Sequence, residues 1–226
     1  MLATRFPTWY KVPEFKIFAS LLRMATKYGF SDVREQLIHS LEGAYPTKWE
    51  AYQTANLVGE DVFGSPRPHP NAVLTLFLEH NIMFAVPLAA YRAALCGFPS
   101  LLSNEPGALL PRHPLASTIH GMETIRSEVS RLAHSIVCNM SVRECRSRCV
   151  VNGSLNSPAR KMKGLNKIYD VMVKEGKGDV LSSLTLGDIV CANCAKAPEE
   201  AYHIWCGAVW ENLPRIFGVG KSWEEL

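Results

Sequence analysis

The sequence predicts a mainly α-helical protein with an irregular multi-helix fold. Apolar residues recur at spacings of three and four in several segments, and no segment alternates apolar and polar residues for more than a few positions. Of the 226 residues, 47% are hydrophobic and 20% are charged, a composition typical of a globular chain with a packed core. The formal net charge of +3 excludes a wholly basic nucleic-acid coat protein and a dominant acidic tail.

The N-terminal part predicts an antiparallel pair of helices with a very short connection. Ser31 can cap the second helix, in which Leu37 and Leu41 share a face, and Gly43 follows its end. The first helix carries one apolar stripe at helical spacing, formed by Phe15, Phe18, Leu22 and Ala25.

A short third helix and then a linker follow this pair. Thr47 and Glu50 have the spacing of a capping box, which predicts the helix start. Residues 64–70 contain three prolines, which lack a backbone donor and bias the preceding residue to extended geometry. We therefore place a domain boundary there, between residues 1–60 and residues 70–226.

Several further helices are predicted beyond the linker. Pro87 suits the first turn of a helix that runs to Leu95. Residues 97–114 contain four prolines, which predicts an irregular loop. Residues 122–136 form the clearest amphipathic helix, and another is expected after Pro158. A C-terminal helix is expected to begin at Pro198 and to end at Pro214.

Both ends of the chain carry distinctive residue runs. Toward the N-terminus they are LLRMATKY at 21–28, LIHSL at 37–41, AYP at 44–46 and PLAAY at 87–91. Toward the C-terminus they are IVCANC at 189–194, WENLPRIFG at 210–218 and WEEL at 223–226. The first runs resemble the last helical pair of the BTB domain in a large group of fungal BTB/POZ proteins, and the later ones resemble the C-terminal signature of that group.

The resemblance implies a protein–protein interaction protein without catalysis, in some members an adaptor to ubiquitin ligases or a transcriptional cofactor. It identifies residues 1–60 as a remnant of the BTB C-terminal helices and residues 70–226 as an appended helical domain. The β-rich half that begins a BTB core has no counterpart before Leu21. A helical pair without that half should expose an apolar patch. We expect the patch to bind another protein or a second copy of the chain through Phe18, Leu22, Leu37 and Leu41.

Cysteine and histidine spacing suggests an alternative function, a small zinc-binding module. Four side chains near the C-terminus could enclose Zn²⁺ tetrahedrally: Cys191, Cys194, His203 and Cys206. Cys145 and Cys149 lie upstream and could supply thiolates instead. His203 and Cys206 also fall inside a predicted helix among apolar residues, where cysteine is a small buried side chain. We therefore favour reduced core thiols and expect no cofactor, with zinc as the alternative.

A basic interval could bring that alternative module to nucleic acid. Residues 126–177 contain eleven Lys+Arg and four Asp+Glu, so their net charge is +7 while the rest of the chain carries −4. Tyr169 is the only aromatic residue in the interval that could stack on a base. The solvated faces of two amphipathic helices explain the charge better, and we do not expect nucleic-acid binding.

Enzymatic activity, secretion and membrane insertion are not expected. Nucleotide-binding glycine loops and the usual hydrolase and metalloprotease motifs are missing from the sequence. His134 and Cys138 could share a helix face, but no third group orients them. The sequence has neither a signal-peptide pattern nor about 20 consecutive apolar residues, which predicts an intracellular protein with no membrane span.

Overall fold

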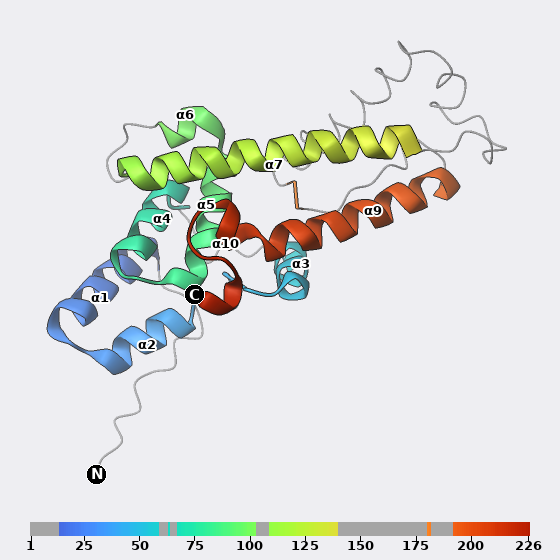
Figure 1. Ribbon diagram of the computed structural model, residues 1–226. Helices are drawn as coiled ribbons and strands as arrows, with labels where there is room; N and C mark the ends of the chain where they lie inside the picture. The colour runs from blue at the N-terminus through green and yellow to red at the C-terminus, as the bar shows by residue number, and fades with distance from the viewer. Residues whose placement is uncertain (1–13, 59–62, 64–66, 103–108, 140–179, 182–191) are drawn as a thin grey trace. The chain divides into compact units, whose positions relative to one another are not determined.

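The computed structural model describes residues 14–58, 63, 67–102, 109–139, 180–181 and 192–226. These residues form α-helices and short 3₁₀ helices with no β-strand among them, so the predicted mainly α fold is confirmed (Figure 1). The chain divides into two compact units, Met1–Thr118 with Leu213–Leu226, and Ile119–Asn212. The linker predicted at residues 64–70 lies inside the first unit, and the division into domains 1–60 and 70–226 stays a prediction.

The predicted N-terminal helical pair is present in the first unit. Helix α1 spans Phe15–Tyr28 and helix α2 spans Ser31–His39. Gly29 between them has a φ of 68°, a left-handed conformation that glycine adopts without strain. Its N–H donates to the carbonyl of Ala25, which ends α1 in a typical C-terminal cap.

Helix α5 is the central helix of the first unit. It spans Val86–Leu95, as predicted from Pro87 in its first turn, and every side chain from Val86 to Tyr91 is buried. Helix α4, Pro70–Glu79, packs closely along α5, and the 3₁₀ helix η1, Met83–Ala85, joins the two. Helix α3 spans Trp49–Val58, close to the start predicted from the capping box.

Aromatic rings join the N-terminal helices to the rest of this unit. The ring of Phe63 lies edge-on to those of Phe15 and Phe18 on α1, at centroid distances of 5.3 and 5.4 Å. Tyr45, after α2, packs edge-on against Phe77 of α4 at 4.9 Å. The guanidinium of Arg92 on α5 lies 4.8 Å from the centre of the Tyr45 ring. Edge-to-face and cation–π contacts of this kind stabilise packing beyond the area they bury.

The structure contradicts the loop predicted at residues 97–114. The structure forms helix α6, Gly97–Leu101, and begins helix α7, Arg112–Asn139, well before the predicted stretch 122–136. Pro99 and Pro114 are each the third residue of their helix. The backbone N–H groups of a first helical turn have no partner within the helix, so a proline there removes no hydrogen bond.

The C-terminal helix also begins earlier than predicted. Helix α9 spans Ala192–Glu211, so Pro198 lies inside it rather than at its start. An internal proline costs a helix about 3 kcal/mol, and burial of Tyr202 and Trp210 on the same helix offsets that cost. Helix α10, Leu213–Ile216, contains Pro214, and the 3₁₀ helix η3, Trp223–Glu225, ends the chain. The helix expected after Pro158 lies outside the described residues.

The second unit includes buried residues on both α7 and α9. The α7 residues that are buried repeat at spacings of three and four, as predicted: Met122, Ile125, Val129, Ala133 and Ile136. On α9, the hydroxyl of Tyr202 donates a hydrogen bond to the carbonyl of Val180. The thiol of Cys206 lies 3.9 Å from the same carbonyl oxygen.

Two substitutions on α1 should separate its buried face from its outer face. Leu22 is fully buried whereas Met24 is 54% exposed. We expect Leu22→Ala to lower the free energy of unfolding by about 2–5 kcal/mol because it leaves a cavity. Met24→Ala should change it by no more than about 0.5 kcal/mol. Urea unfolding followed by circular dichroism measures both, and equal effects would contradict this orientation of α1.

Candidate interaction surface

The four residues expected to bind a partner are core residues. Phe18, Leu22, Leu37 and Leu41 expose 0 to 1% of their surface. The expectation that they form an exposed patch is therefore corrected. The rest of the first unit covers the face of the helical pair that carries them, and no partner can reach these side chains without unfolding that unit.

A different apolar face of α1 is exposed. Ile17, Met24 and Tyr28 expose 50, 54 and 59% of their surface, and Leu21 between them is partly exposed. Their spacing of four, three and four residues places them on one face of the helix. Phe30 continues the face after Gly29, is 55% exposed, and lies 6.1 Å from the Tyr28 ring. We call these five residues the α1 stripe.

Sequence reasoning missed this stripe although its signal is present. The apolar residues of α1 extend around more of the helix than one buried face needs. The exposed row of side chains next to the buried row is also apolar. The spacing of the apolar residues by itself places Leu21 and Tyr28 beside the core stripe. Only the surrounding helices determine which of the two neighbouring files is covered.

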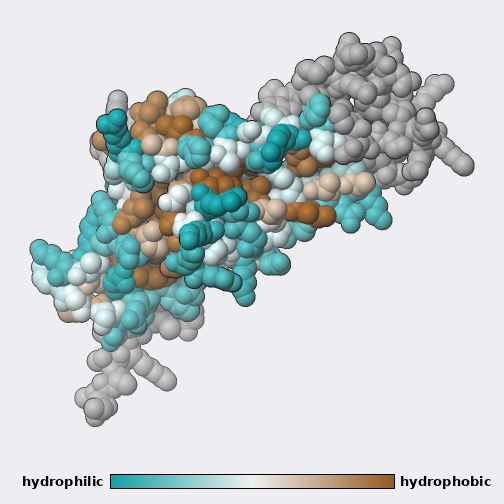
Figure 2. All heavy atoms as spheres, in the orientation of Figure 1, coloured by the Kyte–Doolittle hydropathy of each residue, from teal (hydrophilic) through white to brown (hydrophobic). Residues whose placement is uncertain are grey.

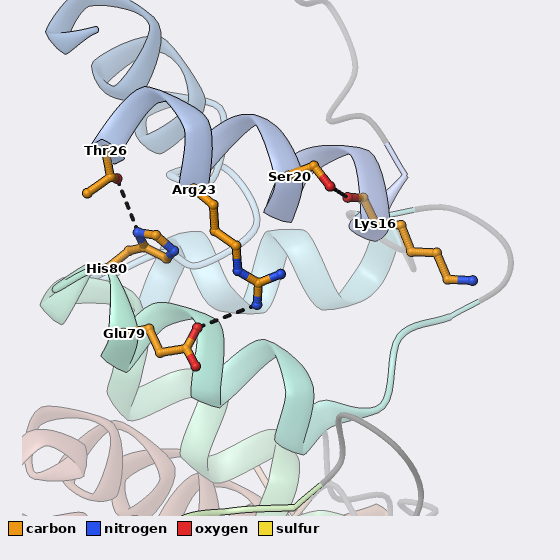
Figure 3. A network of polar contacts seen from close by, with 6 residues as sticks. All are labelled: Lys16, Ser20, Arg23, Thr26, Glu79 and His80. Carbon is orange, nitrogen blue, oxygen red and sulfur yellow. Dashed lines mark hydrogen bonds and ion pairs between the residues drawn. The ribbon is translucent and has the colours of Figure 1, made fainter. Parts of the chain in front are cut away.

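The edge of the α1 stripe is basic. Lys16, Arg23 and Lys27 lie seven and four residues apart, so they share one side of the helix, and α1 contains no acidic residue. Figure 3 shows Arg23 reaching Glu79 of α4, at a distance of 3.5 Å, and Lys16 extending outward. Lys27 lies over the ring of Tyr28 at 5.4 Å. Among the described residues, no carboxylate lies within ion-pair distance of Lys16 or Lys27.

Polar contacts at the end of α4 hold α1 and α2 in this orientation. The Thr26 hydroxyl on α1 and the His80 Nδ1 atom are 3.1 Å apart (Figure 3). Arg34 of α2 donates to the carbonyl of His80 at 2.8 Å. Burial lowers the pKa of His80 below 6.5; the Glu79 carboxylate opposes this effect, and the charges of Arg23 and Arg34 add to it.

A second exposed apolar patch lies at α6. Phe98, Leu102 and Leu109 are 39, 57 and 68% exposed. Apolar side chains gather over α6 in Figure 2. Residues 103–108, between Leu102 and Leu109, are not described, and these three side chains have no common helical register. The α6 patch therefore does not form a continuous row along one helix face, as the α1 stripe does.

The predicted zinc ligands cannot act as one set. Cys194 lies on α9 nine residues before His203 and twelve before Cys206. At 1.5 Å per residue these separations are about 13 and 18 Å, whereas two ligands of one zinc ion lie only about 4 Å apart. His203 is exposed and Cys206 is buried. The described residues contain no metal-binding cluster, and Cys145, Cys149 and Cys191 lie outside them.

One serine–histidine pair was not foreseen, and its geometry does not activate the serine. His69 Nδ1 accepts the N–H of Asn71 at 3.2 Å and so caps α4. The proton of the neutral ring is therefore on Nε2, 3.0 Å from the Ser100 hydroxyl oxygen, and points toward it. A serine nucleophile needs an unprotonated nitrogen there.

The thiol of Cys96 is not activated either. Burial raises the pKa of Cys96, with a smaller opposing effect from the hydrogen bond to Ser100, and its thiol donates to the carbonyl of Arg92 at 3.5 Å. Cys206 is buried. His134 is exposed on α7, and the side chain of Cys138 is outside the described residues.

Two further expectations concern nucleic acid and membranes. Most of the basic interval, residues 140–177, lies outside the described part of the chain, so the nucleic-acid question stays a prediction. Within the described ranges, no helix combines the length and the apolar character that crossing a membrane requires.

Comparison with protein-family models, with curated proteins and with solved structures finds no significant match.

The helical spacing on α9 predicts that His203 does not share a metal ion with Cys194. We expect His203→Ala to leave the zinc content of the purified protein unchanged, measured by plasma mass spectrometry. Cys191→Ser/Cys194→Ser is the companion variant, since it removes the remaining C-x₂-C pair. Loss of about one zinc ion per chain in both variants would place His203 and Cys194 at one zinc site, and α9 would then not be continuous as described.

The environment of His80 predicts a pH dependence of stability. Because its pKa is lower in the folded state than 6.5, the unfolded chain binds more protons as the pH falls. This contribution to stability is present above pH 6.5 and is lost as the pH falls through the folded-state pKa. His80→Gln should make the unfolding free energy fall less between pH 7 and pH 5, measured by urea titration. An unchanged slope would contradict the assignment.

Proposed function

We propose that this protein is a non-enzymatic interaction protein that binds another protein through the α1 stripe. The observation that carries the proposal is the exposure of a contiguous apolar file, Ile17, Leu21, Met24 and Tyr28, on one helix. Single exposed apolar residues are ordinary on protein surfaces, whereas a contiguous file along a helix is typical of a docking face.

The file has the register of helix-mediated recognition. Residues four, seven and eleven positions apart are the anchors by which an amphipathic helix docks on an apolar surface. The inner file of α1 is fixed in the core by Phe18 and Leu22, so the outer file is presented on a rigid helix. A rigid surface loses less conformational entropy on binding than a flexible one.

The resemblance to fungal BTB/POZ proteins supports the same function. The run LLRMATKY at 21–28 includes three residues of the α1 stripe, and the resemblance implies protein binding without catalysis. We propose that α1 and α2 are related to the last helical pair of a BTB domain.

A paired-variant experiment tests the proposed function. Ile17→Ser/Met24→Ser removes two anchors of the stripe without touching the core, and Phe98→Ser/Leu102→Ser removes two equally apolar residues of the α6 patch. In the cells that make this protein, we expect partners to copurify with the wild type and with the α6 variant. The α1 variant should lose them, quantified by mass spectrometry, because the anchors carry most of the binding energy.

Thermal unfolding of both variants provides the control for folding. Each melting temperature should stay close to that of the wild type, since the substituted side chains are exposed. If every copurifying protein were retained by the folded α1 variant, the α1 stripe would not be the binding surface, and the proposed function would lose its support.

A further inference from the structure

We infer that the α1 stripe binds a single amphipathic helix of another protein, and that this helix carries carboxylates along the edge facing Lys16 and Lys27. The inference rests on the proposed function and names the chemistry of the partner. Its grounds are the charge along the stripe, the size of the stripe and the acidic residues at its two ends.

Charge complementarity favours an acidic edge on the partner. Lys16 and Lys27 lie on the same side of α1, next to the stripe, and within the described ranges neither has a carboxylate partner. Arg23, which lies between them, already forms an ion pair with Glu79. A docked helix with carboxylates along this edge would pair with both lysines as its apolar face covers the stripe. Lysines at the same positions of the docked helix would be repelled by Lys16 and Lys27.

The size of the stripe favours one helix rather than a second copy of the chain. Ile17, Met24, Tyr28 and Phe30 are each 50 to 59% exposed, and Leu21 adds less. Large apolar and aromatic side chains offer about 150–250 Å² each, so the stripe offers about 500 Å². A stable dimer buries about 800 Å² on each partner. One helix of three to four turns covers the distance from Ile17 to Tyr28, which is about 16 Å.

Antiparallel pairing of two copies is also opposed by charge. When two α1 helices pack antiparallel about a two-fold axis, the same edge of each lies on the same side of the interface. Lys16 of one copy then approaches Lys27 of the other. A partner with acidic edge residues avoids this repulsion between like charges.

An anionic membrane surface is less favoured than a helix for a geometric reason. The stripe is bracketed by Glu14, which precedes α1, and by Asp32, two residues after Phe30, and both are exposed. A flat layer of anionic headgroups would meet these carboxylates as well as the lysines. A narrow helix lying along α1 can contact the basic edge between them.

A peptide selection on the full-length protein tests the partner chemistry. The probe is a displayed library of 18-residue helices with leucine or methionine fixed on one face, and with Glu, Gln or Lys at each edge position. We expect Glu to exceed Lys by roughly tenfold at the positions along one edge of the selected helices. Lys16→Glu/Lys27→Glu should reverse that preference, and Phe98→Ser/Leu102→Ser should leave it unchanged.

The outcomes separate this inference from the proposed function. Selected helices that need Ile17 and Met24 but show no preference for Glu would overturn the acidic partner and leave the α1 stripe as a binding surface. A dimer in sedimentation velocity that Met24→Ser abolishes would show that a second copy is the occupant and overturn the inference. Stripe-dependent pelleting with phosphatidylserine vesicles, without peptide selection, would show a lipid surface instead and overturn it too. Selected helices that bind the folded Ile17→Ser/Met24→Ser variant equally well would overturn both proposals.

Discussion

The burial of one file of α1 determines the surface that the protein presents. Phe18 and Leu22 are fully enclosed, and Phe63 packs edge-on against Phe18. With that file held in the core, a helix with 3.6 residues per turn must present the adjacent file outward. The packing of α1 against the core therefore holds Ile17, Met24 and the basic edge at the surface. They lie on a helix and not on a flexible loop.

Polar contacts at the end of α4 add direction to this apolar packing. The hydroxyl of Thr26 meets the ring of His80, and Arg34 donates to the carbonyl of the same residue. Apolar burial alone is non-directional, whereas these hydrogen bonds are specific in geometry. Together they attach α1 and α2 to α4 and fix the rotation of α1 about its axis, on which the docking proposal depends.

Local patterns predicted most helices but not all of their limits. The helical pair, the helix at Pro87 and the stripe within residues 122–136 were found because periodicity and proline position are local signals. The loop expected at residues 97–114 and the helix start expected at Pro198 were wrong. A proline is compatible with a first turn or, at a cost, with an interior position, and burial elsewhere on the helix decides between them.

The sequence by itself determined the fold class and which side chains share a face of each helix. Whether a shared face is covered depends on packing with segments distant in the chain, and only the tertiary structure decided it. It placed Leu37 and Leu41 in the core and left Met24 and Tyr28 exposed. It also showed that Cys194 and Cys206 lie far apart on one helix, because the helical rise converts a separation in sequence into a distance.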